Sequence, residues 1–204
     1  MTTAFQYVFN NAESISIDKR RVVATTTTRD NTVRSISRFG QNWKFEVKLP
    51  DGISWTSARQ SIEKMEALDR TTVGAVQINN NGYNSYLTPY QGNAAGTIAA
   101  SWTQGANTIT ITGGSATSGF NFRAGDLIQL GSSGRVYSVT ADVAFNVTTV
   151  PVHRPIIDAS GTGNLILGFN VTWNVLCVDF PSWTIFARDQ VSWSGPFVFY
   201  ENMV

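Results

Sequence analysis

Few residues of this chain combine the side chains and the spacing that catalysis or metal binding requires. The single histidine, His153, has no cysteine or carboxylate at ligand spacing and no serine in a nucleophile-elbow context. The single cysteine, Cys177, falls at the inward-facing parity of an apolar strand, and a catalytic cysteine would need a histidine beside it. Both residues are therefore interpreted as structural.

The acidic residues are equally dispersed. Glu63 and Glu66 share one face of a predicted helix, where solvation explains them. A glycosidase needs two carboxylates facing one substrate, and only the fold could bring Asp126, Asp142 and Asp179 together. The sequence contains no dinucleotide, phosphate-loop or zinc-protease motif. It therefore favours a protein that is not an enzyme and uses no metal or cofactor; a cell-wall-degrading enzyme is the alternative.

The clearest structural pattern is a strand followed by a helix. From Trp43 to Leu49 apolar and polar residues alternate, which predicts a strand with one buried face. Residues 50–52 read as a turn, and Ser54 is a suitable N-cap for a helix over residues 54–69. The apolar face of this helix consists of Trp55, Ala58, Ile62, Met65 and Leu68. Because such a face must be buried, the helix is predicted to cover a sheet.

Shorter β patterns precede this unit. Alternating apolar residues predict strands over residues 5–9 and 15–17. The β-branched run 22–28 predicts another strand. The polar, basic run 32–39 fits an edge or rim strand that carries Arg34 and Arg38 on one face. The basic residues 19–21 between them are interpreted as a solvated strand end.

The middle of the chain predicts a separate small β domain. Several short strands with tight turns lie between two Gly-rich stretches, residues 92–96 and 159–163. Residues 93–158 are therefore predicted to form a small β-barrel or sandwich. It is inserted into a β-sandwich domain built from residues 1–92 and 159–204, which includes the helix. The predicted fold class is mainly β, with one sheet-covering helix.

Charge is low and unevenly distributed. Charged residues make up 14% of the chain and the net charge is +1, which argues against a strong electrostatic partner such as duplex DNA. Residues 71–122 contain no charged side chain. This stretch consists either of polar loops and edge strands or of a surface that neighbouring subunits cover, since uncharged surfaces lack the repulsion that keeps monomers apart.

Aromatic residues in polar surroundings supply the candidate interface. Tyr83, Tyr86 and Tyr90 lie among Asn, Ser, Thr and Pro, a setting typical of an interface loop. Together with Trp102 they could alternatively stack on a carbohydrate, which would make the chain a glycan- or receptor-binding module. Arg34 and Arg38 complete the set of candidate interface residues.

Targeting signals are not predicted. With one cysteine the chain cannot form an internal disulfide. No basic N-terminal run is followed by an apolar one, and no apolar run is long enough to cross a membrane. Synthesis in the cytoplasm is the expectation.

Three stretches resemble minor tail proteins of tailed bacteriophages. They are GQNWKFEVKLP at residues 40–50 with the helix that follows, RAGDLIQL at 123–130 with RVYSVTADV at 135–143, and the Trp-containing C-terminal segment that ends in FVFYE at 197–201. The resemblance extends from about residue 33 to 204, and it rests on the order and spacing of motifs that are weak one by one.

Within that group the chain resembles distal tail or baseplate-hub proteins. The resemblance implies a β-sandwich with a covering helix that assembles into a ring, commonly a hexamer, in the virion at the end of the tail tube. Its partners would be further copies of itself and the neighbouring tube and hub proteins, with host glycan as a further possibility. A second β domain often projects outward in that family, though it more often follows the first domain than interrupts it. A tail terminator, a tube-adjacent ring or another baseplate adaptor would share these features.

Overall fold

The computed structural model describes residues 4–20, 23–37, 41–68, 71–78, 87–131 and 133–203, and the chain is mainly β, as predicted. One antiparallel sheet, here called the body sheet, has the strand order β1-β4-β18-β15-β6. Its strands are β1 (Ser14–Asp18), β4 (Lys44–Lys48), β18 (Phe197–Glu201), β15 (Trp173–Asp179) and β6 (Gly74–Val76). The sheet therefore combines strands from both ends of the chain.

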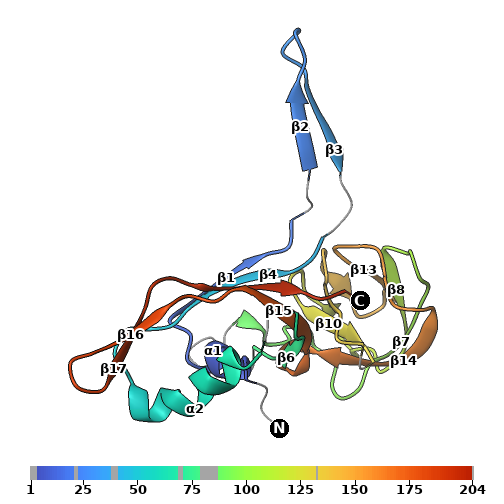
Figure 1. Cartoon of the computed structure of the whole chain (residues 1–204). Helices are drawn as coiled ribbons and strands as arrows, with labels where there is room; N and C mark the ends of the chain where they lie inside the picture. Colours follow the sequence, from blue (N-terminus) through green and yellow to red (C-terminus); the bar gives the residue numbers. More distant parts are fainter. Residues whose placement is uncertain are drawn as a thin grey trace.

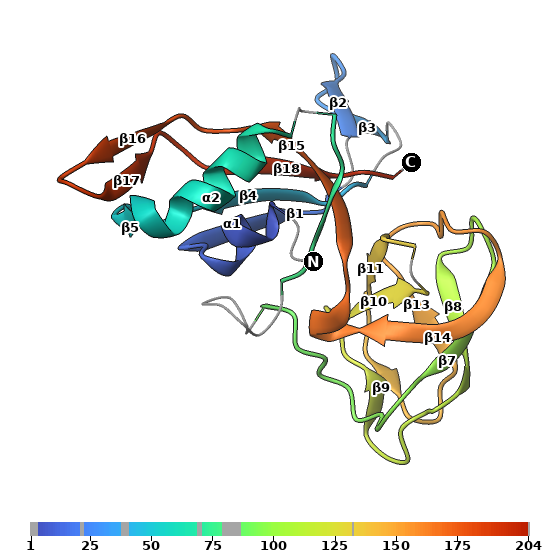
Figure 2. The ribbon, with the colours of Figure 1, turned by 60° about the horizontal axis from the view of Figure 1, so that its bottom comes forward.

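Two helices cover the same face of the body sheet, α1 (Gln6–Asn10) and α2 (Trp55–Glu66) (Figure 2). The alternation in β4 is confirmed, because Phe45 and Val47 are buried beneath the helices while Lys48 is exposed on the other face. The core between helices and sheet is strongly aromatic, with Phe45 and Trp173 in an edge-to-face contact at 5.4 Å. The sheet-covering role predicted for the long helix is thus confirmed.

The strand predicted over residues 5–9 is wrong, because this segment forms the short helix α1. Phe5, Val8 and Phe9 are all buried, a spacing of three to four that suits a helix. The Gln6 side chain adds a two-way contact with the backbone of Gln77, its amide nitrogen donating to the carbonyl at 2.7 Å and its oxygen accepting at 2.8 Å. The helix is therefore fixed beside the end of β6.

The N-terminus of α2 is capped by a residue from the other end of the chain. Ser54 precedes the helix as predicted, but its hydroxyl donates to the carboxylate of Asp189 at 2.5 Å instead of accepting from the helix. The same carboxylate accepts the backbone N–H of Thr56 at 3.1 Å. Asp189 thus takes the N-cap role, and it belongs to the hairpin of β16 (Trp183–Phe186) and β17 (Gln190–Trp193), which pairs with β5 (Ile53–Ser54).

The middle of the chain forms a small barrel. Its strand order is β11-β10-β14-β7-β8-β13, and a bridge between Val139 and Val152 joins the two edges. The strands are β7 (Ala99–Trp102), β8 (Thr108–Gly113), β10 (Leu127–Leu130), β11 (Val136–Ser138), β13 (Thr149–Pro151) and β14 (Gly161–Leu167), with the short pair β9 (Phe120–Phe122) and β12 (Val143–Ala144) alongside. A core separate from that of the body fills its interior.

The barrel ends later in the sequence than predicted. Residues 159–167 were assigned to the larger domain, but β14 pairs with β10 and β7 and so belongs to the barrel. The Gly-rich stretch was interpreted as a linker, whereas Gly161 and Gly163 lie in this strand beneath the ring of Trp102, 3.4 Å from where their Cβ atoms would be. The indole packs flat against the two glycines, so this stretch is part of a covered strand and not a linker. The 3-10 turn η2 (Gly168–Asn170) then leads back to the body sheet.

A hairpin stands away from the rest of the molecule. Strands β2 (Val23–Thr27) and β3 (Val33–Ser37) pair only with each other within the described residues. Figure 1 shows them projecting from the body on the side of the sheet opposite to the helices. We call residues 23–37 the arm. Strands were predicted over both runs, but their projection from the body was not.

Candidate interaction surfaces

The arm is an exposed surface with apolar residues on both of its faces. Every side chain described over residues 24–36 is exposed or half-buried. Val33 and Ile36 are 66% and 68% exposed, far more than apolar residues in a folded domain normally are. Arg34, one of the predicted interface residues, is exposed on β3 opposite Thr26. It therefore lies on the same face of the arm as Ile36, two residues along the strand.

An arm of this kind needs a partner surface to be well ordered. A two-stranded hairpin is marginally stable in water when no third strand or helix covers it. Its strands also present unpaired backbone groups along both outer edges. The described residues of the chain's own body do not cover Val33 or Ile36. The arm is therefore a candidate surface for contact with another molecule.

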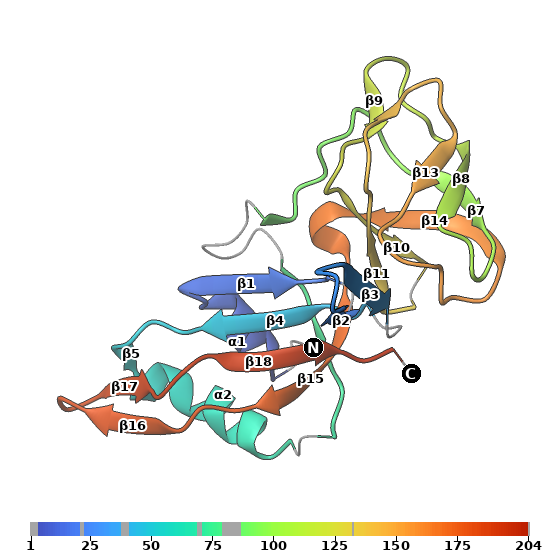
Figure 3. The same cartoon turned by 90° about the horizontal axis from the view of Figure 1, so that it is seen from above.

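The body sheet has an outer face that is turned away from the helices (Figure 3). By residue type this face divides into a charged half and an apolar half. Over β1 and β4 it carries Asp18, Lys44, Glu46 and Lys48, with ion pairs from Lys44 to Glu46 at 2.5 Å and from Lys48 to Glu13 at 3.2 Å. These side chains are partly exposed, so the pairs contribute little to stability.

The apolar half lies over β18 and β15, and we call it the outer stripe. It consists of Leu176, Val178, Val198 and Tyr200. Val178 is 47% and Tyr200 is 39% exposed, and the other two side chains are half-buried. Strand register places Val198 between Glu46 and Asp179. The outer stripe is therefore an exposed apolar strip with the Lys44–Glu46 ion pair on one side and Asp179 on the other, and the Lys44 ammonium lies 5.9 Å from the centre of the Tyr200 ring.

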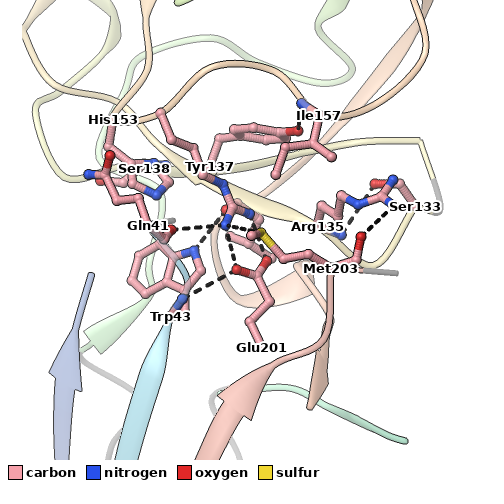
Figure 4. Close-up of polar contacts among 12 residues, drawn as sticks. Gln41, Trp43, Ser133, Arg135, Tyr137, Ser138, His153, Ile157, Glu201 and Met203 are labelled. Carbon is pink, nitrogen blue, oxygen red and sulfur yellow. Dashed lines mark hydrogen bonds and ion pairs between the residues drawn. The ribbon is translucent and has the colours of Figure 1, made fainter. Parts of the chain in front are cut away.

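A buried polar network fixes the barrel on the body sheet. Arg154 of the barrel forms a bidentate ion pair with Glu201 of β18, with N–O distances of 2.5 and 2.7 Å, and both side chains are almost completely buried. Arg154 also donates to the carbonyl oxygens of Gln41 and Val136, each at 3.1 Å. The indole N–H of Trp43 donates to the same Val136 oxygen at 2.8 Å (Figure 4). Body and barrel thus share one set of hydrogen bonds.

Further contacts extend this junction on both sides. The Lys19 ammonium donates to the Ser138 hydroxyl at 2.6 Å and lies 5.0 Å from the centre of the Trp43 ring, and burial lowers the pKa of Lys19. On the other side Arg135 contacts Asp158 at 3.0 Å and the carbonyl of Met203 at 2.9 Å. The basic cluster at 19–21, interpreted as a solvated strand end, therefore contributes Lys19 to a half-buried contact.

His153 and Cys177 both lie in packed, buried positions. His153 packs against Trp43, and its Nδ1 accepts the backbone N–H of Ser138 at 3.0 Å. Its Nε2 has no hydrogen-bond partner among the described residues. Burial, with the nearby charges of Arg154 and Lys19, lowers the pKa of His153 to about 3, so the ring is neutral. Cys177 faces the body core.

Of the three carboxylates considered for catalysis, two accept hydrogen bonds from backbone N–H groups in the barrel, and the third lies on the body sheet. Asp126 accepts the backbone N–H groups of Arg123 and Gln91, each at 2.8 Å, and burial raises its pKa. Asp142 accepts from the Ala124 N–H and the Arg123 guanidinium, contacts that lower its pKa. Asp179 is on the body sheet, not on the barrel. The fold therefore does not bring these three residues into one site.

Two of the predicted interface aromatics are engaged inside the barrel. The Tyr90 ring packs against Phe122, and its hydroxyl donates to the Asn121 carbonyl. Trp102 covers the glycines of β14 and donates to the Ala159 carbonyl at 2.8 Å. Both rings are half-buried. Tyr83, Tyr86 and Arg38 lie outside the described residues, and the interface role of the whole set stays a prediction.

Sequence reasoning missed the junction and the outer stripe. Arg154 and Glu201 carry no local motif and are far apart in the sequence. Tyr200 and Val198 were seen only as part of an apolar C-terminal run, and their outward orientation follows from the parity of Phe197 and Phe199, which are buried.

The described residues contain no group of three or more His, Cys, Asp or Glu side chains arranged to hold a metal ion. Within the same residues, the helices are too short and too polar to cross a bilayer. Comparison with protein-family models gives no match, and comparison with curated proteins gives none either.

Proposed function

We propose that this chain is a structural subunit of a bacteriophage tail tip or baseplate. It forms a homo-oligomeric ring, with a hexamer as the expected order, that joins the tail tube to the hub or receptor-binding parts. The resemblance of residues 33–204 to distal tail proteins suggests this role, and the arm is the observation that carries it. Val33 and Ile36 are exposed on an arm that the described body residues leave uncovered.

Self-assembly explains why such an arm is retained. An exposed hairpin with apolar residues invites non-specific association unless a defined surface receives it. A contact between different surfaces of identical chains repeats from copy to copy and closes into a ring when the rotation allows. Rings with closed symmetry use every arm and leave none exposed.

The buried junction supports the same role. A ring subunit that presents a second domain to other proteins must hold that domain at a fixed angle. The Arg154–Glu201 pair, with its additional hydrogen bonds to backbone carbonyls, joins barrel and body through fully buried polar contacts. Such contacts orient the barrel because they are satisfied in one arrangement only.

The test is the oligomeric state of the full chain with and without the arm. Light scattering after size exclusion should give a multiple of the 22.3 kDa chain mass, and electron microscopy of the same fraction should show rings. Replacing residues 23–37 with a short Gly-Ser turn should give a folded monomer, because the body and barrel cores do not use the arm. As the control, Thr149→Arg on the exposed barrel surface should leave assembly unchanged.

A wild-type chain that stays monomeric, and that also fails to bind the tail proteins encoded beside it, would rule the proposal out. An arm deletion that assembles as well as wild type would remove the argument from the arm. The alternative, a carbohydrate-binding module, is less well supported because the Tyr90 and Trp102 rings pack against other parts of the barrel. A glycan array with the intact chain tests it directly.

A further inference from the structure

We propose that the arm of one copy lies on the outer stripe of the next copy. This inference rests on the proposed ring and adds the partner surface for each arm. The two surfaces belong to the same chain, and in a single copy both are exposed: Val33 and Ile36 on the arm, Val178 and Tyr200 on the body sheet. Apolar surfaces left open in each copy can cover one another when copies meet.

The chemical patterns of the two surfaces are complementary. Ile36 and Arg34 project from one face of the arm, two residues apart. On the outer stripe, Tyr200 and Val198 are also two residues apart on one strand, and Val198 lies between Glu46 and Asp179. The arm face thus carries an apolar and a basic side chain, and the outer stripe carries apolar side chains with Asp179 across from Val198. Electrostatic complementarity of this kind fixes the register of a contact more than it adds affinity.

Geometry makes this contact one between copies. The arm projects away from its own body sheet (Figures 1 and 3), and its apolar side chains are exposed in the chain as a whole. The arm and the outer stripe are different surfaces, so each copy gives one arm and receives one. This is a head-to-tail contact, the kind from which rings are built.

Other exposed apolar residues suit the arm less well. The β16–β17 hairpin presents Ile185 and Phe186, but Arg188 in its turn would face the basic residues of an arriving arm. The barrel presents Phe145 and Val147 beside Arg123, whose guanidinium is already paired with Asp142. Carboxylates lie beside all three patches, but Asp189 beside the hairpin caps α2 and Asp142 beside the barrel patch pairs with Arg123. Asp179, beside the outer stripe, forms no ion pair with the described residues.

Disulfide trapping between copies tests the contact. In a Cys177→Ala background, one chain carries Ile36→Cys and a second carries Val178→Cys. After mild oxidation of the mixture, non-reducing gels should show a cross-linked dimer, and neither chain alone should cross-link. A chain carrying both substitutions should give a ladder up to the ring size. The matched control pairs Ile36→Cys with Thr149→Cys on the barrel, and the cross-linked band should be lost.

A charge exchange gives a second measurement. Arg34→Glu should reduce the assembled fraction in size exclusion, because it places a carboxylate against Asp179. Adding Asp179→Arg to the Arg34→Glu variant should restore the assembled fraction. Intact rings without the 36–178 cross-link would overturn the arm–stripe contact while the proposed function stands. A chain that remains monomeric would overturn both.

Discussion

The Arg154 guanidinium and the Glu201 carboxylate form a buried bidentate ion pair that joins the barrel to the last strand of the body sheet. Desolvating two charges is costly, and their attraction offsets that cost only when the remaining donors and acceptors are satisfied. Here Gln41 and Val136 accept further hydrogen bonds from Arg154, and the backbone N–H of Trp43 donates to Glu201 at 3.3 Å. The Nε–H of Arg154 has no partner among the described residues. The pair therefore joins the two units alongside the barrel residues Leu127 and Val136, which pack into the body core.

Removing one member of this pair should destabilise the protein more than removing both. Glu201→Leu leaves a buried positive charge without its counter-ion, a change that costs about 3–5 kcal/mol. Arg154→Met in the same chain removes that charge, so the double variant should recover part of the loss. Urea denaturation of the two single variants and the double variant measures the coupling. The exposed Lys48–Glu13 pair is the control and should show almost none. Additive losses at Arg154 and Glu201 would contradict this account.

Stability should fall as the pH is lowered from about 6.5, because His153 is buried and neutral. Its folded-state pKa of about 3 lies below the ordinary value of 6.5, so between these values the unfolded chain binds a proton that the folded chain does not. Each pH unit in that window should cost about 1.4 kcal/mol. His153→Asn keeps an acceptor for the Ser138 N–H and should flatten the profile.

Urea denaturation from pH 7 to pH 5 measures this effect above the range in which carboxylates titrate. His153 is the one histidine of the chain, so no other imidazole contributes. If the free energy of unfolding changed with pH equally in wild type and His153→Asn, the folded chain would be able to protonate His153, and its pKa would not be lowered as described.

Strands and helices in which apolar residues recur at a regular spacing could be predicted from the sequence. The alternation from Trp43 to Leu49 and the helical spacing of Ala58, Ile62 and Met65 match the buried faces of β4 and α2. The alternation of Phe5, Tyr7 and Phe9 predicted a strand over residues 5–9, and this prediction is wrong. Val8 is buried as well, which fits the spacing of a helix. A segment of five residues is too short to distinguish the spacing of a strand from that of a helix. Here the hydrogen bonds between Gln6 and Gln77 favour the helix.

The candidate surfaces could not be predicted because they depend on pairings between distant residues. A Gly-Thr-Gly sequence indicates a linker until Trp102 is known to lie across it. The polar strands of the arm have no apolar alternation, so nothing local shows whether a sheet continues beside them. The partner of Arg154 lies 47 residues away and has no motif around it.

The capping of α2 by Asp189 predicts that this distant carboxylate matters more to the helix than the local Ser54 does. Asp189→Ala removes the acceptor for the Thr56 N–H and the negative charge at the helix N-terminus. Hydrogen exchange at the first turn of α2 should accelerate strongly in Asp189→Ala and weakly in Ser54→Ala. The hydrogen bonds lower the pKa of Asp189, so its contribution is fully present above the ordinary carboxyl pKa and is lost as the pH falls through the lowered pKa of the folded state. Faster exchange in Ser54→Ala than in Asp189→Ala would show that Ser54 is the effective cap.

Gly74 and Gly195 differ in the space that is available for a side chain. A Cβ at Gly74 would lie 2.4 Å from the ring of Phe5, which is buried against the body core and has little space to move. Gly74→Ala should therefore destabilise the chain by about 1–3 kcal/mol through overpacking between β6 and α1. Gly195 has open space around its Cβ position and no left-handed backbone, so Gly195→Ala should be neutral or stabilising by about 0.4–1 kcal/mol. Thermal and urea denaturation of both variants measure the difference. If the two variants proved equally stable, α1 would not pack against β6 as closely as described, and the helix would contribute little to holding that edge strand.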